Sequence, residues 1–252
     1  MKNILTFLLA LLLTLSLTCA LAEDTSITYT SGDYDYILLE DGTAEISCYR
    51  GNTEVLEIPS KLDGYRVTSI GNHAFFFNSA LTSVSIPDGV IAIGNNAFPF
   101  CSALAKVVFP ESLISIGESA FSYCTALESV ELPVSVASIG DCAFSFCSAL
   151  TSVTLPESIT VIGNAAFSGC EALPSVVIPG KVVTINIKTF ANCANLTAVF
   201  IPSSVTTIEF RAFSGCSSLD TICVERGSFA EEWCRSEGFS CCYTAHDELL
   251  IN

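Results

Sequence analysis

The sequence predicts a solenoid of stacked 23-residue units, mainly β, with short turns or helical segments between the strands and a cap at each end. Three columns of apolar residues recur at that interval without an insertion. One runs from Ile70 to Ile208, the second from Phe75 to Phe213 and the third from Leu81 to Leu219. Seven units in register are typical of a solenoid, because each unit can bury its apolar face only against its neighbours.

Each unit contains two predicted strands. Residues 81–86 alternate apolar and polar side chains, as expected of a strand with one buried face. Pro87 ends this strand, because proline cannot donate to a central β-ladder. Residues 90–93 form a second short extended piece, and Gly94 permits a turn that a side chain would block. Residues 95–98 indicate a turn or short helical segment that carries the next core residues inward.

The two ends differ from the repeat. Residues 23–69 are predicted to form an N-terminal cap and an atypical first repeat, with a hairpin over residues 34–49 that covers the open sheet edge. Residues 70–222 form the stacked repeats. Residues 223–252 form a C-terminal cap with a short helix that begins at the Ser228–Glu231 capping box and ends at Gly238, a last strand and a frayed tail.

Residues 1–22 have the pattern of a secretory signal peptide. Lys2 is followed by an apolar run and then by Ala20-Leu21-Ala22, so cleavage is expected before Glu23. The alternatives are an uncleaved anchor helix and a lipoprotein modified at Cys19. The small residues favour cleavage, and residues 16–18 match a lipoprotein signal poorly. We therefore expect a secreted or cell-surface protein whose mature chain is not inserted in the membrane.

The charge balance is strongly acidic. The formal net charge of the whole chain is −16, and removal of residues 1–22 takes away one Lys and no acid. Such a surface repels nucleic acid and anionic lipid. We therefore expect no nucleic-acid partner.

Cysteine is abundant, with 13 residues, and six of them form a column in phase with the repeat. A metal site or a disulfide ladder is one interpretation, and a buried column of reduced thiols is the other. Stacked neighbours with parallel side chains have poor disulfide geometry, and Asn78 replaces the cysteine in the first unit, so we favour the reduced column. The column comprises Cys101, Cys124, Cys147, Cys170, Cys193 and Cys216.

The C-terminal cap holds four more cysteines, among which a disulfide would stabilise a small, poorly buried element. Their connectivity is left open by the sequence. The adjacent pair Cys241-Cys242 predicts one side chain directed inward and one outward. The other two are Cys223 and Cys234.

An aromatic column is the best candidate ligand-binding site. Two residues after the core Phe, the last three units carry Gly169, Asn192 and Gly215, which suit a tight bend. Rings in the earlier units are therefore additional to what the bend requires. An exposed column suits carbohydrate rings or protein contacts, whereas a ladder that packs on itself and shields the turns is the favoured structural interpretation. The column comprises Phe77, Phe100, Tyr123 and Phe146.

The outward position of the longer strand gives a second candidate surface. Val108, Val177 and Phe200 are apolar there, where a polar residue would cost nothing. They either form a second binding surface or are present only because β-branched and aromatic residues favour strands.

The full repeat reads S-A-L-x-x-V-x-x-P-x-S-(V/I/L)-x-x-I-G-x-x-A-F-x-x-C. It resembles the BspA-like leucine-rich-repeat family over about residues 34–243. The resemblance implies a leucine-rich-repeat solenoid in a secreted or cell-surface protein that acts in adhesion and binding, and it implies no catalytic residues. This sequence departs from the pattern at Asn186 and Glu209, which replace the turn glycine, and at Asn78.

The motif search gives no support for an enzyme. His73 and His246, the two histidines, lie at a variable turn position and in the tail. The chain has no phosphate-binding loop, metal-binding His-Glu motif or nucleophile elbow, so we expect no metal, cofactor or catalytic residue.

The sequence therefore favours an extracellular binding or adhesion module that displays its repeat surface to a protein or glycan ligand on a host or neighbouring cell. The alternative is a structural spacer or a self-associating component of a surface assembly. A hydrolase, the third possibility, lacks residues to carry the reaction.

Overall fold

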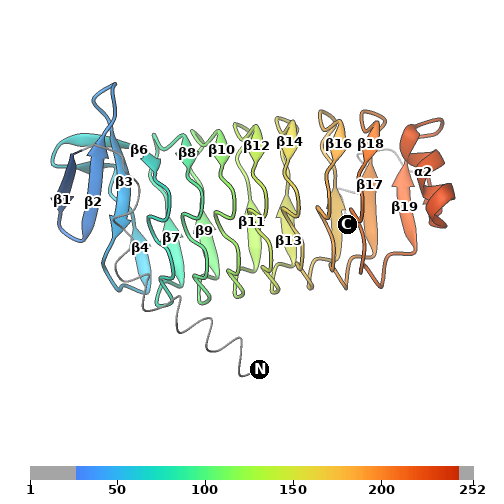
Figure 1. The fold of residues 1–252 in the computed structure, drawn as a ribbon, viewed down its shortest axis with the longest axis horizontal. Coiled ribbons are helices and arrows are strands. Elements are labelled where there is room, and N and C mark those ends of the chain that lie inside the picture. The colour runs from blue at the N-terminus through green and yellow to red at the C-terminus, as the bar shows by residue number, and fades with distance from the viewer. Residues whose placement is uncertain (1–26, 244–252) are drawn as a thin grey trace.

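The computed structural model describes residues 27–243. The expected signal peptide and the expected frayed tail lie outside the described residues. The described part is an elongated solenoid in which consecutive coils lie side by side (Figure 1). This confirms the predicted fold class.

An antiparallel unit starts the described chain. It comprises β1 (Thr28–Ser31), β2 (Tyr34–Leu38) and β3 (Ala44–Tyr49). The β2–β3 hairpin was predicted, and β1 was not. β3 pairs in parallel with β6 (Tyr65–Ile70), so the hairpin covers the open edge of the solenoid sheet.

The solenoid has two rows of parallel strands (Figure 1). Equivalent residues of neighbouring units pair directly, as Ser115 pairs with Ser138, so the sequence columns become physical columns. The row of longer strands comprises β4 (Val55–Glu57), β7 (Ser83–Ser85), β9 (Lys106–Val108), β11 (Ser129–Glu131), β13 (Ser152–Thr154), β15 (Ser175–Val177), β17 (Ala198–Ile201) and β19 (Thr221–Val224). After β6, which β5 (Lys61–Leu62) joins as an antiparallel neighbour, the row of shorter strands comprises β8 (Ala92–Ile93), β10 (Ser115–Ile116), β12 (Ser138–Ile139), β14 (Val161–Ile162), β16 (Thr184–Ile185) and β18 (Thr207–Ile208).

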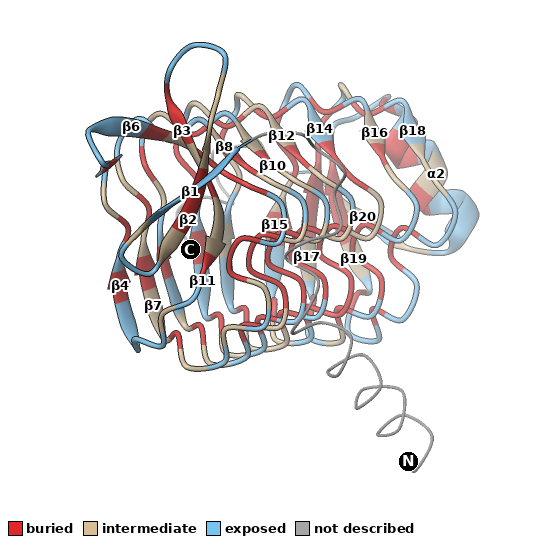
Figure 2. Ribbon diagram, turned by 60° about the vertical axis from the view of Figure 1, so that its left-hand side comes forward, coloured by how far each residue is buried: buried red, intermediate tan, exposed pale blue. Residues whose placement is uncertain are grey.

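A ladder of phenylalanine rings runs through the core. The rings from Phe75 to Phe213 stack with centroids 4.5–5.7 Å apart and with planes within 10° of each other. Tyr49 closes the ladder at one end and Trp233 at the other, at centroid distances of 5.2 and 5.9 Å. Each cap therefore supplies an aromatic side chain that buries the terminal ring, and the buried residues line the interior of every coil (Figure 2).

The glycine that follows the shorter strand in most units, which we call the coil glycine (Gly94, Gly117, Gly140 and Gly163), is required by close contact between neighbouring coils. A Cβ atom on Gly140 would lie 2.6 Å from the backbone nitrogen of Glu118 and from the carbonyl carbon of Gly117. The backbone of Gly140 lies outside the left-handed region. The predicted exclusion of a side chain is therefore correct, and its cause is the neighbouring coil rather than a turn that only glycine can adopt.

Asn186 interrupts this packing. The backbone N–H groups of Gly94, Gly117, Gly140 and Gly163 donate to the isoleucine carbonyl of the preceding coil at 2.7–2.9 Å. At Asn186 the side-chain Nδ2 makes the bond to the equivalent carbonyl of Ile162, at 2.6 Å. The ladder pairing of the shorter strands stops between β14 and β16, which is the junction that Asn186 occupies.

The cysteine column consists of buried, reduced thiols, as predicted. Each thiol donates to the carbonyl oxygen of the core Phe one coil earlier, at 3.0–3.3 Å. Asn78 donates its side-chain N–H to Gly51 O at 3.3 Å in the same manner. Burial raises the pKa of Cys101 and Cys147 to about 12, so these thiols stay protonated at neutral pH. The column therefore satisfies buried carbonyls.

The C-terminal cap contains α2 (Phe229–Glu237) and β20 (Ser240–Cys242). Ser228 Oγ accepts the Glu231 N–H at 3.3 Å, whereas the Glu231 carboxylate accepts the N–H of Gly227 rather than that of Ser228. Gly238 ends the helix with φ 85°. No helix within residues 27–243 is long and apolar enough to cross a membrane.

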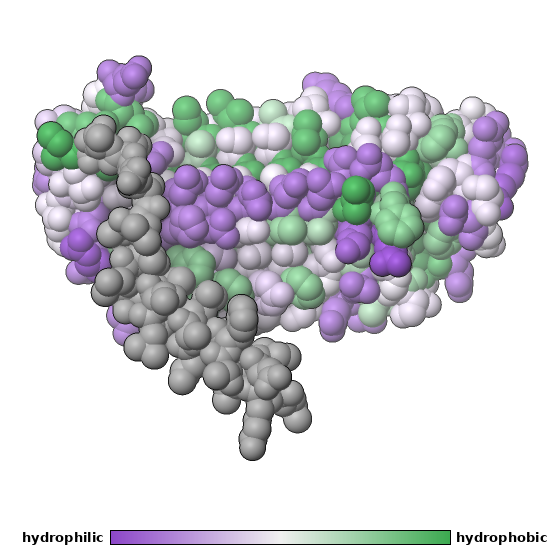
Figure 3. Space-filling model, in the orientation of Figure 1, coloured by the Kyte–Doolittle hydropathy of each residue, from purple (hydrophilic) through white to green (hydrophobic). Residues whose placement is uncertain are grey.

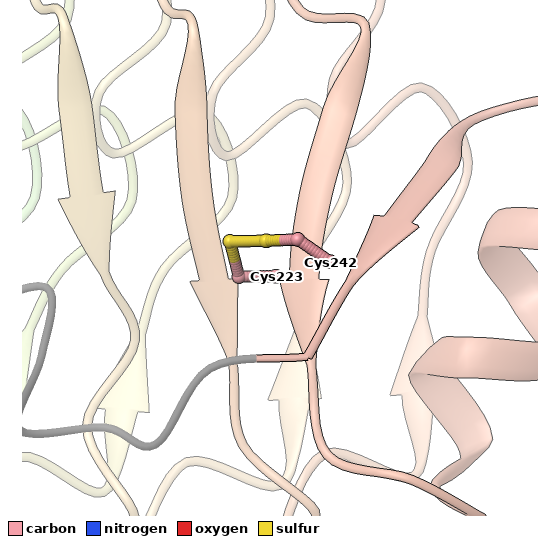
Figure 4. The surroundings of a disulfide bond; sticks show 2 residues. All are labelled: Cys223 and Cys242. Atoms are coloured by element: carbon pink, nitrogen blue, oxygen red, sulfur yellow. A yellow bond between two sulfur atoms is a disulfide. The ribbon is translucent and has the colours of Figure 1, made fainter.

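The cap holds one disulfide among the described residues, between Cys223 of β19 and Cys242 of β20, with Cα atoms 4.4 Å apart (Figure 4). Its neighbour Cys241 is half-buried against the core. The adjacent pair therefore divides between the two sides of β20, as the sequence predicts.

Candidate functional site

The structure brings the four predicted aromatic residues together in one column. All four have left-handed backbones, with φ between 59° and 60°, at the position where later units carry Gly169, Asn192 and Gly215. A left-handed conformation costs a residue with a Cβ roughly 1–2 kcal/mol. The repeat thus requires this conformation in every unit, and the first four units meet it with bulky residues.

The rings of the column stack on one another. The centroid of Tyr123 lies 4.8 Å from that of Phe100 and 4.6 Å from that of Phe146, with interplanar angles of 15° and 17°. The Phe77 and Phe100 rings are 5.8 Å apart and tilted by 39°. Stacking of this kind contributes about 0.5–1.5 kcal/mol per pair, so it offsets part of the backbone strain.

The column is nevertheless exposed. Phe77 and Phe146 are 40% and 41% exposed, Tyr123 is similar and Phe100 is half-buried. Since neighbouring rings cover one another's faces, the exposed surface consists mainly of ring edges. At the C-terminal end the Phe146 ring lies against Gly169, where an added Cβ would be 2.8 Å from Phe146 Cδ1. The column is therefore both self-packed and open to solvent.

A column of polar residues runs beside the coil glycines. Asn95 N–H donates to Asn72 Oδ1 at 2.7 Å, Glu118 N–H donates to Asn95 Oδ1 at 2.8 Å, and Asn164 N–H donates to Asp141 Oδ1 at 2.7 Å. These side chains link successive coils. On the face shown in Figure 3 a hydrophilic band follows the long axis and gives way to hydrophobic residues toward the C-terminal end.

In the last two units this polar column becomes apolar, which sequence analysis missed. Ile187 and Phe210 occupy it and are 42% and 68% exposed. The next column becomes cationic in the same units, with Lys188 and Arg211, and the Arg211 guanidinium lies 4.7 Å from the Phe210 ring centroid. The signal in the sequence was the loss of the coil glycine in these two units.

The second candidate surface is not continuous. Val108 is 44% exposed and Val177 is half-buried, but Phe200 is only 1% exposed, so the prediction that Phe200 lies on an open face is wrong. Phe200 pairs in register with Cys223, which is buried and bonded to Cys242. The outward side chains of the longer strands are therefore buried at the C-terminal end of the solenoid, next to the disulfide.

An open groove of about 790 Å³ lies near the exposed end of that row, between β9 and β11. Backbone pairing is interrupted between these two strands. Its lining includes the three carboxylates Glu111, Glu128 and Glu131. Within the described part of the chain, no three or more His, Cys, Asp or Glu side chains converge as they would around a metal ion.

Comparisons with known proteins agree with this geometry. A family model described as "BspA type Leucine rich repeat region" matches in six copies over residues 47–171 and 137–243. No curated protein matches the chain. The crystal structure of a leucine-rich-repeat protein from T. pallidum is 29% identical, with a TM-score of 0.73, and the match covers 87% of this chain and 100% of that one.

Two further solved structures are more distant. The pneumococcal vaccine antigen PcpA is 22% identical over 80% of this chain and 51% of its own, with a TM-score of 0.55, which shows a shared fold alone. A leucine-rich cell surface protein from Faecalibacterium prausnitzii is 22% identical over 89% of this chain and 100% of its own, with a TM-score of 0.37.

Proposed function

The chain belongs to the BspA-type leucine-rich-repeat family, and from that premise we propose that it is an extracellular binding or adhesion module. Its ligand is a protein on a host or neighbouring cell, bound through the aromatic column. BspA-like proteins are generally binding scaffolds without enzymatic activity. The expected signal peptide, the Cys223–Cys242 disulfide and the similarity in fold to a pneumococcal vaccine antigen support an extracellular location.

The observation that carries the proposal is the cost of the column. Four bulky residues occupy left-handed positions that Gly or Asn fills in the remaining units. At roughly 1–2 kcal/mol each, the four residues carry about 4–8 kcal/mol of backbone strain, whereas three stacked pairs contribute about 1.5–4.5 kcal/mol. Strained residues that also expose apolar surface are typical of binding sites.

The geometry favours a protein ligand over a glycan. A sugar ring stacks on the face of an aromatic side chain, and the inner faces of this column are covered by rings at 4.6–4.8 Å. Ring edges carry partial positive charge and suit carbonyl oxygens and apolar side chains of a protein.

The test is binding of the exported protein to a panel of matrix proteins and glycans, beside a variant with all four aromatic residues changed to Gly. Glycine fits the left-handed backbone, so the variant keeps its fold by circular dichroism. The control is Val108→Ser, which places on the strand face the residue found at Ser85. We expect wild type and control to bind a protein and the aromatic variant to lose that binding. Equal binding by all three, or binding of glycans alone, would contradict the proposal.

A further inference from the structure

Three neighbouring columns of the solenoid change character at the same unit. We call the surface that they form the turn face. Its first column holds the residue directly after the coil glycine of each unit, and its second column holds the residue after that. Its third column is the aromatic column together with the small residues that replace it in the last three units. These columns are, respectively, Asn72, Asn95, Glu118, Asp141, Asn164, Ile187 and Phe210; His73, Asn96, Ser119, Cys142, Ala165, Lys188 and Arg211; and Phe77, Phe100, Tyr123, Phe146, Gly169, Asn192 and Gly215.

The unit containing Asn164, Ala165 and Gly169 separates two unlike halves of the turn face. On its N-terminal side the third column is bulky and the first carries the acids Glu118 and Asp141. On its C-terminal side the third column is small, the first is apolar and the second is cationic. The dividing unit itself has only small or uncharged side chains on this face.

Each half is complementary to the other half of a second copy that runs in the opposite direction. We propose that the turn face is an interface on which a second copy of this chain packs antiparallel, with a twofold axis at the Ala165 unit. The axis brings each unit opposite the unit equally far on the other side of Ala165. Tyr123 then lies opposite Gly215 and Phe146 opposite Asn192, so that large residues meet small ones.

The same axis pairs opposite charges. The same register places Asp141 and Glu118 opposite Ile187 and Phe210 in the first column. Lys188 and Arg211 lie in the adjacent second column of those units, so each cation meets an acid of the other copy diagonally. Both cations are exposed and on this face. An isologous contact of this kind forms every such pair twice. It also covers Ile187 and Phe210, whose exposure is otherwise unfavourable.

The overall charge makes the position of the cations informative. Residues 107–180 contain no Lys or Arg and seven acidic residues, so two copies repel each other in most orientations. The antiparallel arrangement places the cations of one copy beside the acids of the other. An anionic bilayer offers no such match, because the chain carries a net charge of −16 and the face has only two cations.

This inference goes beyond the proposed ligand binding and does not require it, but the interface covers Tyr123 and Phe146 of the aromatic column. Only two repeats follow the Ala165 unit, so only units within two of the axis face another repeat across the interface. Phe77 is four units from the axis and lies outside this region. A dimer would therefore display two separate ends of the aromatic column, one from each copy.

The decisive experiment places a cysteine on the axis. In Ala165→Cys the new thiol faces its own copy, and the left-handed backbone accepts it because Cys142 has φ 55° in the same column. Oxidation by glutathione disulfide joins the two thiols and yields two molecules of glutathione, which gives a covalent dimer on a non-reducing gel. The matched control Asn96→Cys, three coils away in the same column, faces a different unit and stays monomeric on the gel.

A charge exchange gives an independent readout. By sedimentation velocity we expect wild type to form a concentration-dependent dimer and Arg211→Glu to weaken it about tenfold, equivalent to ~1.4 kcal/mol. Combining Arg211→Glu with Glu118→Arg restores the pair and the dimer. The proposal is overturned if wild type stays monomeric, if the two cysteine variants cross-link equally, or if the exchange fails to restore association. Binding of the monomer to phosphatidylglycerol vesicles through Phe210 would instead assign the face to a membrane. Ligand binding by a monomer would leave the proposed function intact, which separates the two conclusions.

Discussion

Replacement of Gly140 by Ala tests the contact that sets the spacing between coils. The added Cβ would lie 2.6 Å from backbone atoms of the preceding coil, where ordinary contact needs about 3.5 Å. The coils must therefore separate by nearly 1 Å. The hydrogen bond from Gly140 N–H to Ile116 O, now 2.8 Å, would then exceed the usual limit.

Two or three inter-coil hydrogen bonds are affected, each contributing about 1 kcal/mol. Reduced backbone entropy of the unfolded chain returns about 0.4–1 kcal/mol. The expected net loss in free energy of unfolding is about 2 kcal/mol, and the melting temperature falls by roughly 4–8 °C for a chain of this length. Thermal unfolding followed by circular dichroism measures it.

Two control variants separate the possible causes. Gly42→Ala meets no atom within 4 Å but has φ 79°, so it reports backbone strain alone, about 1 kcal/mol. Asn186→Gly restores the repeat at the junction where the coils already differ, and we expect a change below about 1 kcal/mol as one hydrogen bond replaces another. A Gly140→Ala protein as stable as wild type would refute the account of the glycine column.

Three further predictions concern the thiols and the C-terminal cap. Burial raises the pKa of Cys147 from 9.0 to about 12, so the thiol loses its proton at a lower pH in the unfolded chain than in the folded one. The free energy of unfolding should therefore fall as pH rises from 9 towards 12. Urea unfolding measures this, and we expect the free energy of Cys147→Ala to depend less steeply on pH. Reduction of Cys223–Cys242, which are 19 residues apart, should destabilise the cap by about 3 kcal/mol, and the fluorescence of Trp233, the sole tryptophan, should then change before the circular dichroism of the repeats. Ser228→Ala removes the N-cap acceptor and should cost about 1 kcal/mol in the same fluorescence assay.

The solenoid could be predicted because its periodicity converts sequence spacing into spatial neighbours. A 23-residue step is enough to place Cys101 beside Cys124 and Phe77 beside Phe100, and the structure confirms both placements. The reduced state of the thiol column followed from the same geometry. The function of each thiol as a hydrogen-bond donor did not, since it depends on a carbonyl 26 residues earlier.

Exposure could not be predicted from column membership. Val108 and Phe200 hold the same register position, yet one is 44% exposed and the other 1%. Periodicity fixes the direction of a side chain but not what covers it, and that coverage changes along the solenoid towards the disulfide. The same limit applies to the aromatic column, whose balance between self-packing and exposure depends on ring angles that the repeat does not encode.

Departures from a repeat are informative when they occur together. The loss of one coil glycine at Asn186 alone would be a packing variation, repaired by its side-chain hydrogen bond to Ile162. Its neighbours Ile187 and Lys188 change in the same unit, and the next unit repeats the change. A single substitution can be neutral to the fold, but parallel substitutions in adjacent coils create a surface, because the solenoid places them side by side. The turn face therefore combines apolar, cationic and acidic side chains from several units, a combination that no single unit contains. For this reason we assign association to the face as a whole rather than to isolated residues.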